Sequence, residues 1–279
     1  MIGIIDVSRN INGVFGAGVM DYLTEHDIRL DYGIGSSSGG TNLISYFAGQ
    51  KGRSYLFYYD YASRREYLNI RNIGTENNLI DMDLLYDKTF SEFTKYPFAY
   101  DQTGKEINNF YILATEADTG MPHYFDMLDP ETDRLSAIKA SYSIPVVNEP
   151  YSINEKTYYD GYISDPLPFM KAFNDGCEKV ILITARPLSY RRDQKRDKFL
   201  LRMLGSQYPD VAQQMKRLSD MYNTEIDLAL NMQDAGRLLI LAPENISAIQ
   251  TILKDKKRIT NLYNEGYHAA GAVRSFLNL

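Results

Sequence analysis

Ser37 stands at the centre of a Gly-x-Ser-x-Gly pattern that runs from Gly35 to Gly39. An apolar run at 32–35 precedes the pattern, and a helical spacing of apolar residues follows it over 42–49. Small residues two places before and after a serine allow a sharp turn from strand to helix, which presents the hydroxyl at the helix N-terminus. The pattern therefore predicts a nucleophilic serine.

Other glycine-rich turns compete with this interpretation. In a plain helix cap, Ser37 or Ser38 would serve as the N-cap residue. A phosphate-binding loop needs Lys-Ser/Thr after its last glycine, whereas Thr41 and Asn42 follow Gly40. A dinucleotide-binding fingerprint needs a third glycine where Ser38 stands. The two nucleotide-binding loops are excluded, and the plain cap stays open as an alternative.

A serine nucleophile needs a general base, and the sequence has three histidines. His268 would complete the chain order Ser37, Asp160, histidine of an α/β-hydrolase triad. It lies inside a helical pattern, however, and not on a loop after a strand. His26 stands at the end of the first predicted helix, and His123 sits in a predicted turn after 120–122. None of the three is well placed to act on the serine.

Asp160 is the better candidate for the base. It follows a predicted strand at 157–159 and precedes Gly161, so we expect it at the carboxyl end of a strand, where α/β sheets place their sites. A carboxylate there can take the proton from a serine directly. Asp165 precedes Pro166 and is predicted to cap a helix with proline in its first turn.

Short apolar runs alternate with longer stretches of helical period along the chain, which is typical of βα units and a mostly parallel sheet. Strands are predicted at 3–5, 32–35, 110–114, 157–159, 180–184 and 238–241. Helices are predicted at 13–25 and 42–49, and beyond residue 185 the chain is mainly helical, ending in one amphipathic helix over 259–277. The predicted fold class is α/β.

The composition excludes several classes of protein. A chain of 279 residues with 44% hydrophobic residues supports a buried core, which excludes a disordered chain. The single cysteine, Cys177, excludes a disulfide-stapled secreted scaffold and favours the cytoplasm. The net charge of −6 argues against a nucleic-acid partner. Since we find neither a signal peptide nor an apolar run long enough to span a bilayer, we expect a soluble protein, peripheral to a membrane at most.

Three blocks of the sequence resemble the patatin-like phospholipase family, in particular its bacterial members. Residues 31–40 look like the family's block around Gly-x-Ser-x-Gly. Residues 140–145, Ala-Ser-Tyr-Ser-Ile-Pro, are similar to its Ala-Ser-x-Ala-x-Pro block, with Ser143 in place of alanine. Residues 159–162, Tyr-Asp-Gly-Tyr, look like its Asp-Gly-Gly/Ala block. Order and spacing agree with the family, and the similarity covers about residues 2–185.

The resemblance implies a three-layer α/β/α sandwich with a mostly parallel central sheet. It implies a catalytic core at 1–185 and a helical C-terminal extension at 186–279 that packs on the same domain. The protein would hydrolyse lipid or carboxylic esters through an acyl-enzyme, with no cofactor and no metal.

The same resemblance assigns roles to residues at the site. Ser37 would be the nucleophile and Asp160 the base of a dyad that uses no histidine. Gly35, Gly39 and Gly161 would support the two motifs that carry this dyad.

One block departs from the family pattern. The family's oxyanion loop is Gly-Gly-Gly-x-Arg-Gly, and Ser8, Arg9 and Asn10 align with its three glycines. Glycine lets backbone N–H groups point at an oxyanion through positive φ, which asparagine also tolerates. The N–H of Ser38 would remain as a donor. Arg9 would either offer its charge to the oxyanion or fold inward and block the site. In the second case the protein would be impaired in catalysis and would bind acyl lipid or a protein partner.

Aromatic and basic segments raise the question of a membrane surface. Residues 55–61 hold four tyrosines and a phenylalanine, which suit a lipid-facing rim or ordinary helix packing. Basic residues gather at 186–198 and 254–258, where they suit anionic head groups or a solvated face. Packing and solvation are the simpler interpretation. Peripheral membrane contact and the oligomeric state both stay open.

Overall fold

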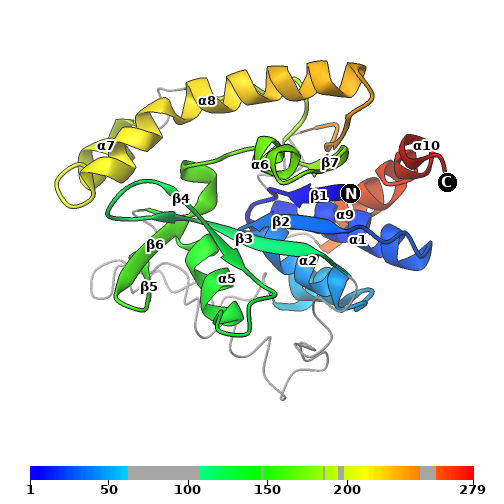
Figure 1. The fold of residues 1–279 in the computed structure, drawn as a ribbon, viewed down its shortest axis with the longest axis horizontal. Helices are drawn as coiled ribbons and strands as arrows, with labels where there is room; N and C mark the ends of the chain where they lie inside the picture. Colours follow the sequence, from blue (N-terminus) through cyan, green and yellow to red (C-terminus); the bar gives the residue numbers. More distant parts are fainter. Residues whose placement is uncertain (62–106, 146–147, 185, 194–197, 246–255) are drawn as a thin grey trace.

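The computed structural model describes residues 1–61, 107–145, 148–184, 186–193, 198–245 and 256–279. These residues form an eight-stranded sheet in the order β5-β6-β3-β2-β1-β7-β8, with β4 paired to β3 beside this path (Figure 1). Strands β3, β2, β1, β7 and β8 are parallel, whereas β4, β5 and β6 join through antiparallel pairs. The strands are β1 (Ile2–Asp6), β2 (Tyr32–Ser36), β3 (Asn109–Glu116), β4 (Pro122–Asp126), β5 (Tyr151–Ile153), β6 (Lys156–Asp160), β7 (Lys179–Ile183) and β8 (Leu238–Leu241).

Strand β1 illustrates why the sheet is covered on both faces. Ile4 and Ile5 are neighbours in the sequence and both are fully buried, although successive strand residues point to opposite faces. Ile4 packs in one apolar cluster with Val14, whereas Ile5 packs in another with Leu218. A strand that is buried on both sides therefore has a continuous apolar run in place of an alternating pattern.

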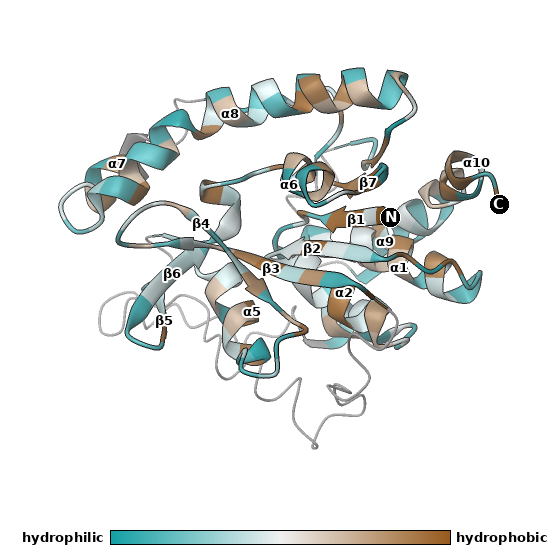
Figure 2. Cartoon of the chain, viewed as in Figure 1, coloured by the Kyte–Doolittle hydropathy of each residue, from teal (hydrophilic) through white to brown (hydrophobic). Residues whose placement is uncertain are grey.

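Helices form the two outer layers (Figures 1 and 2). One face of the sheet carries α1 (Gly13–Glu25), α2 (Ser38–Phe47), α5 (Arg134–Tyr142) and α9 (Lys256–Ala269), and the other carries α6 (Phe169–Asn174) and α8 (Pro209–Asp234). The shorter elements are η1 (Asn10–Asn12), α3 (Arg53–Leu56), η2 (Phe57–Tyr61), η6 (Gly161–Ile163), α7 (Lys198–Leu204) and α10 (Ala272–Leu277). The predicted α/β/α sandwich is confirmed.

The prediction of one continuous C-terminal helix is wrong. Helix α9 ends at Ala269 and α10 begins at Ala272. Between them the N–H of Gly271 donates to the carbonyl of His268. This bond spans three residues, as in a 3₁₀-helix, and not four, as in an α-helix. Glycine is a poor helix former, so this short stretch of the chain changes direction at little cost.

The predicted helix cap at Asp165 is also wrong. Helix α6 begins only at Phe169, and Asp165 accepts a hydrogen bond from the hydroxyl of Tyr124 on β4. Pro168 delays the helix, because the residue before a proline is disfavoured in the helical region.

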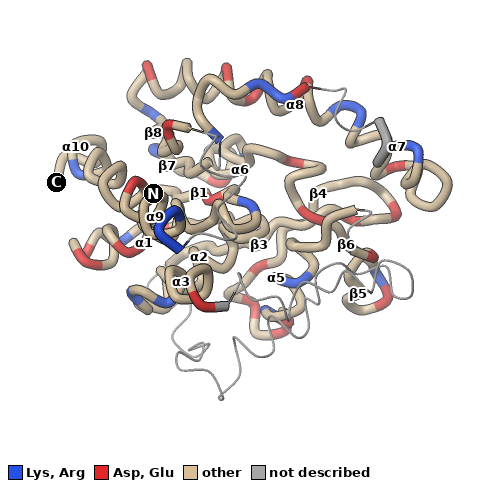
Figure 3. Tube along the Cα trace, turned by 180° about the vertical axis from the view of Figure 1, so that it is seen from behind, with Lys and Arg blue, Asp and Glu red and all other residues tan. Residues whose placement is uncertain are grey.

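None of the helices in the described part of the chain is long and apolar enough to cross a membrane. Helix α8, which has 26 residues, carries both basic and acidic residues along its length (Figure 3).

Candidate active site

The chain turns sharply at Ser37, between β2 and α2. Ser37 has φ 54° and ψ −129°, a conformation that a residue with a Cβ adopts only under strain. The flanking glycines make the turn possible. A Cβ on Gly35 would lie 2.4 Å from the Cα of Gly40, and a Cβ on Gly39 would lie 1.9 Å from the carbonyl oxygen of Asp6. The geometry is that of a strand-to-helix elbow with the serine at its tip.

The hydroxyl of Ser37 is buried and has no hydrogen-bond partner among the described residues. Its backbone is held instead, because the N–H of Ser37 donates to Ser141 Oγ at 2.7 Å. Ser141 Oγ in turn donates to the carbonyl of Leu113 on β3 at 2.6 Å. Sequence reasoning quoted Ser141 in a block but gave it no role, and the structure places it as the support of the elbow.

Asp160 lies at the end of β6 and is fully buried. Ser36 pairs with Leu113 across β2 and β3, and the next residue of β3, Ala114, pairs with Asp160. The register therefore brings Asp160 to the sheet edge where Ser37 projects. The hydroxyl of Ser36 contacts Asp160 Oδ1 at 3.4 Å, and the N–H of Tyr162 donates to the same oxygen at 3.0 Å.

Gly161, directly after Asp160, sits against β3. A Cβ at this position would lie 2.5 Å from the carbonyl oxygen of Leu113. Any side chain here would therefore push Asp160 away from the elbow.

Arg9 forms an ion pair with the other carboxylate oxygen of Asp160, Oδ2. Its Nε and Nη2 lie 3.0 Å and 2.8 Å from Asp160 Oδ2, and its guanidinium stacks 4.6 Å above the ring of Tyr162. Of the two alternatives left open by the sequence, the structure has Arg9 folded inward. Both oxygens of Asp160 are engaged, and Ser37 Oγ makes no hydrogen bond to it.

The loop before α1 keeps a defined shape without the three glycines. Asn10 adopts φ 55°, the left-handed conformation that asparagine tolerates. The N–H of Ser8 donates to Asp6 Oδ1 at 2.8 Å, so it is not free to contact an oxyanion. The carbonyl of Ser8 accepts from the N–H of Gly39 at 3.2 Å, which ties the loop to the elbow. Ser38 begins α2, so its N–H has no carbonyl partner within the helix.

A buried polar network that sequence reasoning missed lies behind the elbow. Asp6, at the end of β1, is fully buried, and burial raises the pKa of its carboxyl group. Asn42 Nδ2 donates to Asp6 Oδ2 at 2.9 Å and to the carbonyl of Gly13 at 2.8 Å. The hydroxyl of Tyr58 donates to Asn42 Oδ1 at 3.1 Å and lies 3.3 Å from the carbonyl of Ser38. The network fixes the first turns of α1 and α2 against each other. Its only signal in the sequence is a carboxylate at the end of the first strand.

The aromatic segment at 55–61 packs into the molecule where its side chains are described. Phe57 and Tyr58 are buried, and the rings of Tyr55 and Tyr263 lie 4.5 Å apart. The side chain of Tyr61 lies outside the described part of the structure.

The histidines stand apart from the elbow. His26 follows the last residue of α1, and His268 lies within α9. His123 belongs to β4, not to the predicted turn, and its Nδ1 lies 3.4 Å from Glu116. Within the described residues no three metal-ligating side chains cluster.

The family model described as "Patatin-like phospholipase" matches residues 10–173. The chain belongs to this family. A second model, "Domain of unknown function (DUF6363)", matches residues 208–274.

The chain is also similar to one protein in sequence and to one solved structure in fold. An uncharacterized protein from Escherichia coli strain K12, YjjU, is 29% identical over 180 residues, which cover 63% of this chain and 49% of that protein. The patatin-like chain thus spans about half the length of the curated relative it matches. The crystal structure of VipD from Legionella pneumophila aligns with a TM-score of 0.50 at 11% identity, covering 97% of this chain and 66% of that one. This likeness shows the fold alone.

Proposed function

We propose that this protein is a serine acyl hydrolase that cleaves lipid or carboxylic esters, with Ser37 as nucleophile and Asp160 as base. One observation carries the proposal. Ser37 holds a strained backbone conformation at the N-terminus of α2, with a buried and unbonded hydroxyl, at the sheet edge that also holds the buried carboxylate of Asp160. Strained residues of this kind cluster at active sites, and the resemblance in sequence assigns the same pair.

The proposed reaction divides ester cleavage into two steps. Asp160 takes the proton of Ser37 as Ser37 Oγ attacks the ester carbonyl, and the resulting oxyanion faces the N–H of Ser38 and the positive end of α2. The C–O bond to the leaving group then breaks, and the alcohol takes up the proton from Asp160. In the second step, water attacks the acyl-serine with Asp160 again as base, which releases the carboxylic acid and restores Ser37. Arg9 must leave Asp160 before either step.

Labelling with a fluorophosphonate probe, together with turnover of short and long acyl esters, tests this assignment. We expect the wild type to be labelled, and Ser37→Ala and Asp160→Asn to lose labelling and turnover. Asp165→Asn is the matched control, because Asp165 is also poorly exposed and close in sequence but bonds to Tyr124. Turnover that survives Ser37→Ala would refute the dyad.

A second candidate function is a catalytically impaired member of the fold that binds acyl lipid or a protein partner. The contact of Arg9 with Asp160 favours it, as does the replacement of the loop glycines by Ser8, Arg9 and Asn10. Absence of labelling and turnover in the wild type would select this candidate. Replacing residues 8–10 by glycine would then restore activity if the loop is the cause.

We further propose that residues 1–185 form the catalytic core and that 186–279 form a helical extension packed on the same domain. Two contacts support the packing of the extension on the core. Strand β8 pairs with β7, and α9 packs closely on α1.

A further inference from the structure

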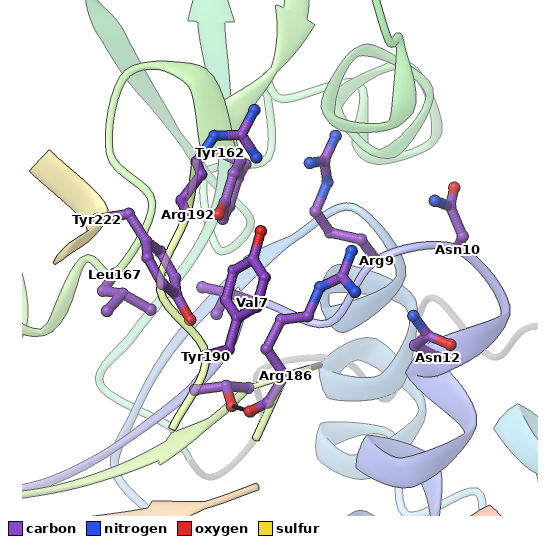
Figure 4. A pocket seen from close by; sticks show the side chains of 11 residues that line it. Val7, Arg9, Asn10, Asn12, Tyr162, Leu167, Arg186, Tyr190, Arg192 and Tyr222 are labelled. Atoms are coloured by element: carbon purple, nitrogen blue, oxygen red, sulfur yellow. Dashed lines mark hydrogen bonds between the residues drawn. The ribbon is translucent and has the colours of Figure 1, made fainter. Parts of the chain in front are cut away.

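A cavity of about 70 Å³ is lined in part by Arg9, the residue that also pairs with Asp160. It lies between the loop after β1, the segment after β7, and α8 (Figure 4). The side chains of three arginines reach into it, and none of the residues that line it carries a carboxylate. Arginine and tyrosine are the commonest residues of the lining, which includes Arg9, Arg186, Arg192, Tyr162 and Tyr190.

The three guanidinium groups are held by aromatic rings. Arg9 and Arg192 lie 4.6 Å and 5.6 Å from the ring centre of Tyr162, and Arg186 lies 5.1 Å from that of Tyr190. Stacking orients a planar guanidinium and keeps its N–H donors at the edge of the plane, where they can bond an acceptor.

In the described part of the chain, carboxylates compensate the charges of Arg9 and Arg186 only in part. Within the described part of the chain no carboxylate pairs with Arg186, and Arg9 shares a single aspartate. Burial raises the pKa of Tyr162, and the charges of Arg192, Arg9 and Arg186 all act in the opposite direction, because they favour a negative charge at this place.

We infer that this cavity binds a phosphate group, free or in a lipid head group, and that the bound phosphate competes with Asp160 for Arg9. A phosphate monoester carries a charge of about −1.5 to −2 at pH 7 and three strong acceptor oxygens. The guanidinium forks of Arg9 and Arg186, which line the same small space, match those oxygens, because arginine binds phosphate bidentately. A space of about 70 Å³ is large enough for a small anion.

Phosphate binding would prepare the site for the reaction proposed above. Arg9 reaches both Asp160 and the cavity, so an anion in the cavity draws the guanidinium away and frees Asp160 Oδ2 to take the proton of Ser37. This consequence for the rate rests on the proposed function. The binding itself does not, because it needs neither Ser37 nor turnover.

Titration calorimetry with inorganic phosphate and with glycerol phosphate, on the full chain carrying Ser37→Ala, tests the binding. We expect Arg186→Gln, added to this background, to weaken binding about tenfold or more, the usual effect of losing a hydrogen bond to a charged group. Arg191→Gln is the matched control, because Arg191 is exposed and pairs with Asp227 outside the cavity. Equal effects of the two substitutions would overturn the proposal.

The competition has a signature of its own. Asp160→Asn removes the carboxylate that holds Arg9, so phosphate should bind this variant several-fold more tightly than it binds the wild type. A merely structural role of Asp160 would instead leave the affinity unchanged or lower it, and either result would contradict the competition. An unfolding transition like that of the wild type shows that the variant is folded.

Vesicles separate the two sources of phosphate. Stronger binding to vesicles with phosphatidic acid than to phosphatidylcholine alone, with no binding of the soluble ions, would assign the site to a lipid head group. Binding of the soluble ions would assign it to free phosphate. If neither binds, the inference is wrong even where fluorophosphonate labels Ser37. Conversely, if Ser37→Ala leaves turnover intact, the proposed dyad is wrong. The phosphate site is then still tested by its own titration.

Discussion

At the scale of single residues, the backbone of Ser37 is held in place by a side chain from another helix. A positive φ at a residue with a Cβ costs on the order of 1–3 kcal/mol, and it persists only where the surroundings enforce it. Ser141 does so here, because its hydroxyl accepts from Ser37 and donates to Leu113 at the same time. The hydroxyl thus ties the elbow to β3, the strand that also pairs with Asp160.

We expect Ser141→Ala to slow fluorophosphonate labelling of Ser37 by about tenfold or more and to lower the free energy of unfolding by about 1–3 kcal/mol. The reason is that the buried N–H of Ser37 and the carbonyl of Leu113 both lose their partner. Ser143→Ala is the matched control, since Ser143 Oγ is buried at the end of the same helix but bonds only to the carbonyl of Lys139. Labelling at the wild-type rate in Ser141→Ala would contradict this role.

The sequence predicts Ser37 and Asp160 as site residues but gives no indication of the partner of Asp160. Ser37 lies in a local pattern of glycines, and a local pattern is enough to predict a turn. Arg9 and Asp160 are 151 positions apart, and their contact depends on the packing of β1 and β6 in one sheet. The sequence is compatible with an Arg9 that offers its charge to the oxyanion and with an Arg9 that folds inward. Only the three-dimensional arrangement distinguishes the two.

At the scale of elements, β6 reaches the site by a route that differs from the one expected. The sequence predicts Asp160 at the carboxyl end of a strand, the end at which parallel sheets carry their functional sites. Strand β6 instead runs antiparallel to β3. Asp160 reaches the carboxyl edge of the parallel strands because β6 pairs only with the last residues of β3. The residue was identified, but the direction of its strand depends on long-range pairing that no local pattern encodes.

Helices α1 and α9 approach each other through glycines. A Cβ on Gly18 would lie 2.0 Å from the carbonyl oxygen of Tyr263, and a Cβ on Gly266 would lie 2.0 Å from that of Phe15. In both cases the obstacle is backbone, which cannot rotate away. The contact brings α9 against the helix that follows the loop of Ser8, Arg9 and Asn10.

We expect Gly18→Ala and Gly266→Ala each to lower the free energy of unfolding by about 2–3 kcal/mol, measured in urea. Alanine in a helix ordinarily gains about 1 kcal/mol over glycine, so the sign of the effect tests the close contact. Gly271→Ala is the control, because a Cβ there would lie 3.2 Å from the nearest atom and its φ is an ordinary −55°. Stabilisation by alanine at residues 18 and 266 would show that the helices do not touch here.

At the scale of the whole molecule, the parts before and after residue 185 share their apolar cores. Helix α8 supplies Leu218 and Tyr222 to the cluster that also contains Ile5 of β1. Glu225 of the same helix accepts a hydrogen bond from the N–H of Leu167 at 3.1 Å. Burial raises the pKa of Glu225 to about 8, and the nearby charge of Asp165 adds to this effect. Burial also raises the pKa of Asp165, to about 6.

These carboxylates make the stability of the folded molecule depend on pH. In the unfolded chain Glu225 releases its proton near its ordinary pKa of 4.5, whereas the folded protein retains the proton up to about pH 8. Between these values the folded state binds more protons, so stability is fully present below about pH 4.5 and is lost as the pH rises to about 8. Asp165 acts in the same direction at lower pH.

Glutamine imitates the protonated form of Glu225 at every pH, and it can still accept the bond from Leu167. We therefore expect Glu225→Gln to raise the free energy of unfolding at pH 8 by at least ~2 kcal/mol over the wild type, and to leave it nearly unchanged at pH 4.5. Urea titrations across this range measure the difference, with Asp227→Asn, an exposed carboxylate on the same helix, as control. Because α8 shares an apolar core with β1, we expect the wild type and the variant each to unfold in a single transition. A change of pH should then shift the midpoint of that single transition. A variant with the same pH profile as the wild type would show that Glu225 is ionised in the folded protein.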